Sequence, residues 1–340
     1  MHAFILAGGF ATRLWPLTEK RAKPLLPLAG KPILTHLVEK IPLEMPVTVS
    51  TNAVFRESFE LWKESMHRKN LEIIIEDSTH DDHKLGALGA TAQWIANGHN
   101  EEDILLLTGD NYLGFSMDAF LGSYTQETPL LAAYDIKDLS KASAFGTVLT
   151  KTSPLPPSDG SLPAGRQGLG MGEKQNKQVL AFEEKPAQPK TSLVSTGCSV
   201  LPAKTLSIVL AFAKKHPDNV GGIFEEFLRQ QIAVDCFTFT EPWRDIGSFP
   251  AYLDAHRLLV CEKAIVHPQA SIKECSLEGS ITVDKGSTIE KSELTDCMIF
   301  KNCIIENCTL RNCIIDEGCT LTKIDLTGKM LRAGTTLTRG

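Results

Sequence analysis

The last quarter of the chain carries a short repeat, which limits the possible folds more than any other feature of the sequence. A period of five or six residues indicates a solenoid, because each repeat buries its apolar side chains only against its neighbours. The spacing suits a left-handed parallel β-helix, in which each flat face contributes one aliphatic and one small inward side chain per rung. The tandem five-residue steps predict some irregularity in the coils. The aliphatic residues of the repeat are Ile272, Leu277, Val283, Ile289, Leu294, Ile299, Ile305, Leu310, Ile315 and Leu321.

Most of the nine cysteines lie in this repeat. Cys303, Cys308 and Cys313 each stand two positions before an aliphatic residue of the series, which places them in the small inward slot. The repeat contains no C-x-x-C pair with zinc-ligand spacing, and nothing in the sequence announces the oxidising compartment that disulfides require. We therefore predict buried free thiols in the core of the solenoid. The remaining cysteines of the repeat are Cys275, Cys297 and Cys319.

The start of the chain predicts a strand that ends in a ligand-binding loop. Residues 3–7 form an apolar run typical of a buried parallel strand, and Gly8-Gly9 lets the backbone turn sharply and approach a ligand without side-chain obstruction. The N–H groups of such a turn form a cradle for anions. Arg13 adds a planar fork that can clamp phosphate oxygens, and Lys23 adds a second positive charge. An ordinary tight turn with two solvated cations is the alternative interpretation.

Between these two regions, strand and helix patterns alternate along the chain. Such a rhythm predicts an α/β fold with a Rossmann-like, mostly parallel sheet, helices on both faces, and ligands beyond the carboxyl ends of the strands. The expected strands are 47–50, 71–76, 104–108 and 130–134, and the expected helices are 32–40, 54–68 and 86–97.

We expect two domains, an α/β domain over residues 1–262 and the β-helix over residues 263–340. The first contains a stretch rich in Pro, Gly and Ser at about 153–178, which predicts a flexible insertion. Residues 145–148 before it and 179–183 after it look like neighbouring strands of one sheet. The insertion is therefore expected to be a long hairpin loop rather than a linker between domains.

The segment Leu-Thr-Gly-Asp-Asn at residues 107–111 places a carboxylate directly after an apolar strand, where a ligand of an α/β sheet should lie. Mg²⁺ prefers carboxylate oxygens together with substrate phosphates, and it would neutralise charge and align two phosphate groups for in-line attack. Asp110 is therefore a candidate metal ligand and catalytic residue. A Gly-Asp-Asn turn without chemistry is the alternative.

Residues 6–18, read Leu-Ala-Gly-Gly-Phe-Ala-Thr-Arg-Leu-Trp-Pro-Leu-Thr, together with Lys23-Pro24 resemble the signature of the sugar-phosphate nucleotidyltransferases, also called nucleotide-sugar pyrophosphorylases. The signature is distinct from the phosphate-binding loop of ATPases and from the dinucleotide fingerprint Gly-x-Gly-x-x-Gly. Ala11 stands where the family usually has glycine, so we expect a loop of slightly altered geometry.

The resemblance implies that an oxygen of a sugar 1-phosphate attacks the α-phosphorus of a nucleoside triphosphate, so that a nucleotide sugar forms and pyrophosphate leaves. It implies that Mg²⁺ binds Asp110 and Asp245, the latter in a segment Trp-Arg-Asp-Ile-Gly-Ser that is similar to the family's W-x-D-x-G. Arg13 and Lys23 are the implied catalytic cations, with Arg13 stabilising the departing pyrophosphate. As a structural alternative, Asp245 or Ser248 caps a helix that begins near residue 249.

The resemblance also points to substrate-binding residues. Residues 85–90, read Leu-Gly-Ala-Leu-Gly-Ala, are similar to the family's L-G-T-A-G-A pattern, which contacts the base through backbone groups. Glu184 and Lys185 lie in a segment like the family's E-E-K-P, where Glu orients sugar hydroxyls and Lys contacts the sugar's phosphate. The implied binding residues are Leu6, Ala7, Gly8, Gly9, Leu85 and Gly86 for the nucleotide, and Gly146, Glu184, Lys185, Thr196 and Gly197 for the sugar phosphate.

Charge and hydropathy exclude other classes of partner. The formal net charge of -6 argues against a broad nucleic-acid surface, so phosphate recognition must come from a few local cations. Nothing at the N-terminus resembles a signal peptide, and no apolar run has the length that spans a bilayer. We expect a cytoplasmic protein with small substrates, no nucleic-acid or membrane partner, and a homo-oligomeric state, because solenoids of this kind often associate side by side.

For the substrates, we favour glucose 1-phosphate with dTTP or UTP, followed by mannose 1-phosphate with a guanosine nucleotide. A regulatory subunit that binds nucleotide sugars without turnover is the main alternative, but both candidate metal ligands and all candidate cations are present, which favours an enzyme. A bifunctional enzyme whose β-helix also transfers an acetyl group is a third hypothesis. The solenoid, with about four coils of about 18 residues, is short for an acyl-CoA cleft.

Overall fold

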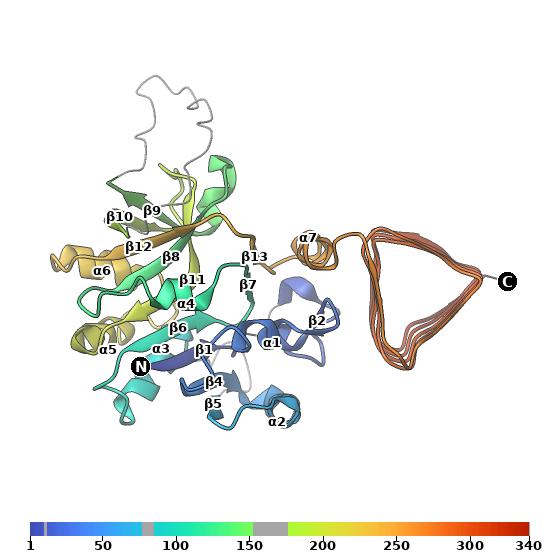
Figure 1. Ribbon diagram of the computed structural model, residues 1–340, viewed down its shortest axis with the longest axis horizontal. Helices are drawn as coiled ribbons and strands as arrows, with labels where there is room; N and C mark the ends of the chain where they lie inside the picture. The colour runs from blue at the N-terminus through green and yellow to red at the C-terminus, as the bar shows by residue number, and fades with distance from the viewer. Residues whose placement is uncertain (10–11, 77–84, 152–175, 340) are drawn as a thin grey trace, which may run out of the picture. The chain divides into compact units, whose positions relative to one another are not determined.

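The computed structural model of the chain describes residues 1–9, 12–76, 85–151 and 176–339 (Figure 1). It divides into two compact units, each built from several stretches of the chain. Unit 1 comprises Met1–Gly8, Val38–Arg56 and Lys63–Trp243, and unit 2 comprises Gly9–Leu37, Glu57–Trp62 and Arg244–Gly340. Nearly all of the predicted insertion at 153–178 lies outside the described residues.

Unit 1 is built on one sheet, which has nine strands within the described residues. The strand order is β5-β4-β1-β6-β11-β8-β12-β10-β9. Two helices of this unit, α5 and α6, pack with α3 and β10 around the sheet's apolar core. The strands are β1 (His2–Leu6), β4 (Val47–Asn52), β5 (Leu71–Glu76), β6 (Ile104–Thr108), β8 (Leu130–Asp135), β9 (Gly146–Thr150), β10 (Lys177–Glu184), β11 (Leu193–Leu201) and β12 (Asp235–Phe239). The helices are α3 (Ala87–Ala96), α4 (Met117–Leu121), α5 (Leu206–Ala213) and α6 (Gly222–Arg229).

The sheet is mixed, which corrects the expectation of a mostly parallel one. Strand β1 is parallel to β4 and β6, and β4 is parallel to β5, as in a doubly wound fold. Strand β11, however, is antiparallel to both β6 and β8, and β10 is antiparallel to β9. Apolar burial is the same beside parallel and antiparallel neighbours, so the apolar runs that predicted the strands did not indicate strand direction. The hairpin predicted between residues 145–148 and 179–183 is confirmed.

Several expected elements match the observed ones to within two residues at each end. Strands β5 and β6 have the predicted bounds, and helix α3 is one residue shorter at each end than predicted. The predicted helix over 54–68 is shorter, because a 3-10 turn over Ala53–Phe55 precedes α2 (Arg56–Ser65). The predicted helix over 32–40 is α1 (Ile33–Val38). No helix in the described part of the chain combines the length and the apolar character needed to cross a bilayer.

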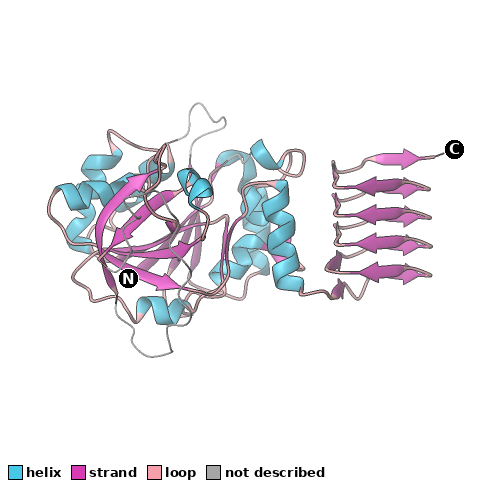
Figure 2. Cartoon of the chain, turned by 90° about the horizontal axis from the view of Figure 1, so that it is seen from above, coloured by secondary structure: helices cyan, strands magenta, loops and turns pink. Residues whose placement is uncertain are grey.

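Unit 2 contains the predicted parallel β-helix. Its three flat faces are parallel sheets, which enclose a triangular core when viewed along the coil axis (Figure 1), and successive coils stack as rungs (Figure 2). The faces are β14 (Ala264–Val266), β17 (Ile281–Val283), β20 (Met298–Ile299), β23 (Ile314–Ile315) and β26 (Met330–Leu331); β15 (Ser271–Lys273), β18 (Thr288–Glu290), β21 (Ile304–Glu306), β24 (Thr320–Thr322) and β27 (Thr336–Thr338); and β16 (Ser276–Glu278), β19 (Glu293–Thr295), β22 (Thr309–Arg311) and β25 (Asp325–Thr327).

The coils are shorter than predicted. Ile265 pairs with Thr282, so the first coil takes 17 residues, and Thr282 pairs with Met298, so the next takes 16 rather than about 18. The five-residue steps turn at tight corners in the left-handed backbone region, where Asn307 has φ 52° and Asn312 has φ 53°. Asparagine tolerates this region better than most residues.

The cysteines of the repeat fill the small inward positions, as predicted. Cys297, Cys303, Cys313 and Cys319 are fully buried, and all nine cysteines of the chain are free thiols. Each of these four Sγ atoms also bonds a backbone carbonyl of the adjacent coil, for example Cys297 to the oxygen of Leu310 at 3.4 Å. Packing therefore accounts for these cysteines, and Cys275 is only half-buried.

Arg21 lies in the stretch Gly9–Leu37, the loop region of unit 2, and links it to the β-helix. Its guanidinium donates to Asp316 Oδ1 at 3.1 Å and to Glu317 Oε2 at 2.7 Å, and it lies 5.5 Å from the centre of the Phe300 ring. Burial raises the pKa of Asp316, while the positive charge of Arg21 opposes that rise. The ion pair therefore compensates a buried carboxylate at the side of the solenoid.

Helix α7 (Phe249–Val260) precedes the first coil. Ser248 is its N-cap, because Ser248 Oγ accepts a hydrogen bond from the N–H of Ala251, and Pro250 occupies the first turn. Tyr252 on this helix donates its hydroxyl to the carbonyl of Pro27. The fully buried His256 lies 3.1 Å through Nε2 from the carbonyl of Ser280, so Nε2 carries the proton in the neutral ring.

Removing an inward aliphatic side chain from the solenoid should destabilise it. Leu310 is fully buried in β22, and Leu310→Ala is expected to lower the free energy of unfolding by about 2–5 kcal/mol because it leaves a cavity. Ile304 is 52% exposed, so Ile304→Ala is the matched control and should cost less than about 1 kcal/mol. Urea unfolding followed by circular dichroism measures both, and equal losses would contradict the inward assignment of Leu310.

His256 should make unit 2 less stable in mild acid. Burial lowers the pKa of His256 from 6.5 to about 4, so between these values the unfolded chain binds a proton that the folded chain does not. Stability is therefore present at neutral pH and is lost as the pH falls, by about 2 kcal/mol at pH 5. His256→Gln keeps a donor for Ser280 but does not titrate. Between pH 7.5 and pH 5, the urea midpoint should fall further in the wild type than in His256→Gln. Identical falls in the two proteins would refute the assignment.

Candidate active site

The sequence-predicted site residues are shared between the two units. They lie mainly in turns and strand ends of the sheet, and in the loop region that starts at Gly9. Unit 1 holds Leu6, Ala7, Gly8, Leu85, Gly86, Asp110, Gly146, Glu184, Lys185, Thr196 and Gly197, and unit 2 holds Gly9, Arg13, Lys23 and Asp245.

Gly8 follows β1 and lies against a buried carboxylate. A Cβ atom at Gly8 would lie only 2.7 Å from Oε1 of Glu76, so a larger residue would displace that side chain. Ser50 donates its hydroxyl to the same oxygen at 2.7 Å, and Asn52 Nδ2 donates to the carbonyl of Gly8 at 2.9 Å. Burial raises the pKa of Glu76, although the bond from Ser50 opposes the rise. Sequence reasoning did not single out Glu76; its place at the end of β5, beside the glycine turn, was the available signal.

The strand residues before this turn take part in the sheet. The N–H of Ala7 donates to the carbonyl of Ser50 at 2.8 Å, and the carbonyl of Leu6 accepts from the N–H of Gly109 at 2.8 Å. The amide of Ala7 is therefore engaged by protein, and a phosphate-binding role falls to the backbone beyond it. Residues 10 and 11, including the departure at Ala11, lie outside the described residues.

Asp110 is held by a chain of hydrogen bonds at the carboxyl end of β6. Asn111 Nδ2 donates to Asp110 Oδ1 at 3.0 Å and to Thr108 Oγ1 at 2.7 Å. In turn, Asn111 Oδ1 accepts from Trp243 Nε1 at 2.9 Å. Asn111 and Trp243 are both buried, whereas Asp110 is half-buried, so two buried side chains orient a carboxylate that solvent can reach. Sequence reasoning quoted Asn111 as part of the motif without assigning it this role.

Thr196 and Gly197 lie on the antiparallel strand next to β6. Thr196 is 1% exposed, and its hydroxyl donates to the carbonyl of Ala132 at 3.0 Å, so a sugar contact at this residue would have to use its backbone. Gly197 has φ 72°, and a Cβ atom there would collide with the side chain of Thr108. Glycine at this position therefore permits close packing against the strand that carries Asp110.

Glu184 lies between two glycines. A Cβ atom at Gly146 would come within 2.9 Å of Glu184 Oε2, and one at Gly221 would collide with the same carboxylate. Burial raises the pKa of Glu184, while Lys185, with Nζ 3.7 Å from Glu184 Oε1, opposes the rise. The structure thus brings Gly146, Glu184 and Lys185 together, as the sequence predicted, and adds Gly221. The backbone N–H of Glu184 donates to Glu225 Oε1 at 2.7 Å and holds the strand end in place.

Gly86 is the N-cap of helix α3 and has φ 77°. A Cβ atom there would lie 2.5 Å from the carbonyl oxygen of Pro217. That same oxygen accepts from the N–H groups of Leu88 at 2.8 Å and Gly89 at 3.0 Å. The first amides of the helix are therefore already satisfied by protein, and base recognition through this turn would fall to Leu85 and Gly86 themselves. Residues 77–84 before the turn lie outside the described residues.

Unit 2 pairs a predicted cation with a predicted metal ligand. Lys23 Nζ lies 3.8 Å from Asp245 Oδ1, with Lys23 buried and the Asp245 side chain 34% exposed. Lys23 lies in a 3-10 turn over Lys23–Leu25, and Asp245 ends β13 (Trp243–Asp245). Arg13 is exposed on a separate 3-10 turn over Thr12–Leu14. The oxygen donors of Asp110 and Asp245 suit Mg²⁺, which prefers carboxylates and keeps positions open for phosphates.

Comparison with known protein families covers nearly the whole chain. A family model described as nucleotidyl transferase matches residues 2–261, and one described as the GlmU-like C-terminal hexapeptide matches residues 252–331. The predicted order of an α/β domain followed by a left-handed β-helix agrees with both matches.

Two curated proteins and one solved structure illustrate the similarity. The bifunctional protein GlmU of Methanocaldococcus jannaschii is 22% identical over 84% of this chain, and the chain spans only 61% of that relative's length. The glucose-1-phosphate adenylyltransferase of Fusobacterium nucleatum is 25% identical over 88% of this chain and 80% of its own. A crystal structure of a candidate glucose-1-phosphate thymidylyltransferase from Bacillus anthracis, determined with sucrose, is 18% identical, covers 76% of this chain and 94% of its own, and superposes with a TM-score of 0.59.

The bond between Asn111 and Trp243 should be energetically coupled. Asn111→Leu removes the acceptor that the buried indole N–H uses, and it is expected to lower the free energy of unfolding by about 1–3 kcal/mol. Trp243→Phe removes the donor instead. Because both changes break one shared bond, the double variant should cost less than the sum of the single variants. Chemical denaturation of all four proteins measures this, and simple additivity would show that the bond does not orient the Asp110 turn.

Proposed function

The chain belongs to the nucleotidyl transferase family, and from that premise we propose that it joins a nucleoside triphosphate and a sugar 1-phosphate into a nucleotide sugar. In this reaction, an oxygen of the sugar phosphate forms a bond to the α-phosphorus, and the bond from that phosphorus to the bridging oxygen of the β-phosphate breaks. Pyrophosphate leaves with that oxygen. The observation that carries the proposal is the Asp110 carboxylate, held at the carboxyl end of β6 by Asn111.

Two polyanions must approach each other in this reaction, so the residues that surround them act mainly by positioning and by electrostatics. Asp110 and Asp245 would hold Mg²⁺, which when bound neutralises phosphate charge. Arg13 would hold the phosphates that leave, and Lys23, already beside Asp245, keeps a fixed positive charge near that carboxylate. No covalent intermediate with the protein is required.

The sugar phosphate is proposed to bind at the end of β10. Glu184 is a partly desolvated carboxylate, which suits it to hydrogen-bond sugar hydroxyls, and Lys185 supplies a charge for the phosphate. Gly146 packs closely against Phe182 and Glu184, so a side chain at this position would displace the Glu184 carboxylate. For the triphosphate, Gly8 offers backbone with no side chain in the way.

Glucose 1-phosphate with dTTP or UTP is the favoured substrate pair. Support for the sugar comes from the Fusobacterium and Bacillus relatives, both of which are named for glucose 1-phosphate. Mannose 1-phosphate with GTP is the second candidate. A regulatory subunit that binds nucleotide sugars without turnover is the non-catalytic alternative, and a second acetyl-transferring activity in the β-helix would fit the bifunctional relative. We also propose a cytoplasmic location, which the nine free thiols support, and a homo-oligomer formed through the β-helix.

Pyrophosphate release from a panel of substrates tests the function. dTTP, UTP, GTP, ATP and CTP are each combined with glucose 1-phosphate, mannose 1-phosphate or N-acetylglucosamine 1-phosphate in the presence of Mg²⁺. We expect release with glucose 1-phosphate and dTTP or UTP, and loss of about 100-fold or more in Arg13→Ala and in Asp110→Asn with unchanged thermal stability. Arg339→Ala, at an exposed arginine near the chain end, is the matched control.

The other outcomes distinguish the alternatives. Binding of a nucleotide sugar without pyrophosphate release by any pair would favour the regulatory subunit. Full activity in Arg13→Ala or Asp110→Asn would refute the roles of those residues. Consumption of an acetyl-CoA thioester with an amino-sugar phosphate would establish the bifunctional alternative.

A further inference from the structure

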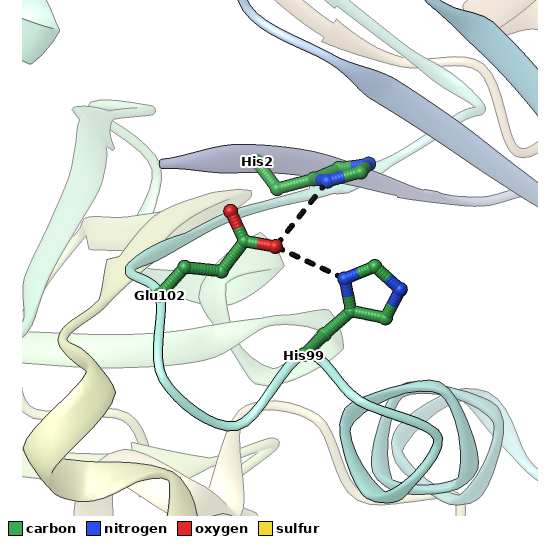
Figure 3. A group of neighbouring side chains, drawn as sticks. All are labelled: His2, His99 and Glu102. Atoms are coloured by element: carbon green, nitrogen blue, oxygen red, sulfur yellow. Dashed lines mark hydrogen bonds and ion pairs between the residues drawn. The ribbon is translucent and has the colours of Figure 1, made fainter.

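Three potential metal ligands meet at the amino-terminal end of β1, at the opposite end of that strand from Gly8 (Figure 3). His2 Nδ1 lies 3.4 Å from Glu102 Oε1, and His99 Nδ1 lies 3.0 Å from the same oxygen. The three ligand atoms all lie within 4.8 Å of one another. The proposed transfer reaction uses none of these residues.

Secondary structure brings the three side chains together. His2 begins β1, His99 follows helix α3, and Glu102 lies in the loop that leads into β6. The N–H of His2 donates to the carbonyl of Asp103 at 3.0 Å, and the N–H of His99 donates to the carbonyl of Ile95 at 3.0 Å. Backbone hydrogen bonds therefore fix the positions from which the two imidazole side chains reach Glu102.

Both imidazole rings are held by their neighbours. The ring of Trp94 stacks on His99 with centroids 3.9 Å apart and planes 12° apart, and it meets His2 edge-on at 4.8 Å. His2 Nε2 lies 2.8 Å from Thr48 Oγ1. When Thr48 accepts the Nε2 proton, the Nδ1 lone pair of His2 faces Glu102 and His99. A hydrogen bond to the second ring nitrogen is how proteins commonly fix the tautomer of a metal-binding histidine.

Other charged groups lie near these three residues. The amino group of Met1 lies 3.9 Å from the second oxygen of Glu102, and the charge of the Glu72 carboxylate acts on the His2 ring. A metal ion binds an imidazole only in its neutral form, so zinc binding at this site competes with protons.

We propose that His2, His99 and Glu102 bind a Zn²⁺ ion, with its remaining position open to water. Two imidazole nitrogens and one carboxylate are a donor set that zinc accepts, whereas Mg²⁺ prefers oxygen ligands alone. In a tetrahedral site with bonds of about 2.1 Å, ligand atoms lie about 3.4 Å apart. His2 Nδ1, at 3.4 Å from Glu102 Oε1, already lies at this separation, and His99 Nδ1, at 3.0 Å, would move slightly away from the same oxygen.

The ion would act as a structural clamp. It would join the first residue of β1 to the segment between α3 and β6, and these two strands are neighbours in the sheet. The competing explanation is a metal-free group in which both imidazoles donate to Glu102. The two explanations differ in zinc affinity, in the stability that zinc confers, and in the response to removal of single ligands.

Zinc titration of the full chain, purified without a histidine tag and stripped with a chelator, tests the proposal. Calorimetry against a competing chelator should show one Zn²⁺ per chain, and saturating Zn²⁺ should raise the melting temperature because the ion binds the folded state. Glu102→Gln removes the anionic ligand, and His99→Phe keeps a ring on Trp94 but lacks the nitrogen. Each should weaken zinc binding on the order of 100-fold or more. His67→Gln, at an exposed histidine, is the matched control and should change nothing.

Co²⁺ supplies a readout of geometry. Visible absorption bands of four-coordinate Co²⁺ should appear in the wild type and in His67→Gln and be absent from the two ligand variants, whose folding circular dichroism verifies. Absence of zinc binding by the wild type at micromolar concentration would overturn the proposal on its own. So would binding that Glu102→Gln and His99→Phe leave unchanged. Pyrophosphate release by the same proteins is measured separately, so failure of the clamp and failure of the proposed reaction are distinguishable.

Discussion

The parallel pairing of β1 with β6 positions two groups of residues, one at the carboxyl ends of these strands and one at their amino ends. Leu6 lies opposite Thr108, so the Gly8 turn and the Asp110 turn emerge side by side at the carboxyl edge. The same register sets His2 opposite Ile104, which brings Glu102 to the first residue of β1 at the amino edge. A shift of one residue would reverse the faces of these side chains and separate both groups.

Buried carboxylates beside glycines are a recurring element of this protein. Glu76 fills the space that a side chain at Gly8 would need, and Glu184 does so at Gly146 and Gly221. Burial raises the pKa of both carboxyl groups. Desolvation strengthens the hydrogen bonds that such groups make, and the missing side chains leave room for the carboxylates themselves. Each of these acids therefore packs against a glycine that is far from it in the sequence.

Most coils of the β-helix have the same length, and five-residue steps between inward side chains make these coils short. Sixteen-residue coils place equivalent side chains above one another, so aliphatic residues and cysteines form continuous columns. Residues in the left-handed backbone region turn the corners of the short steps, some of them Asn or Gly, such as Asn307 and Gly328, and others charged, such as Lys291. Hydrogen bonds from the thiols to the next coil add to the backbone ladder. Arg21, which precedes helix α1, bonds Asp316 of the β-helix, and Tyr252 on helix α7 bonds the carbonyl of Pro27.

Local patterns in the sequence determined the class of each region. A continuous apolar run located β6, the short period located the solenoid and its buried cysteines, and strand-end motifs located Asp110 and Glu184. The sequence did not show the direction of the strands, because apolar periodicity is the same in parallel and antiparallel neighbours. Only the tertiary structure showed that the sheet is mixed. Only the tertiary structure revealed Glu76 beside Gly8, Trp243 behind Asn111, the Lys23–Asp245 pair and the His2 cluster. Each joins residues distant in the chain, and sheet register and packing, rather than local sequence, decide which side chains meet.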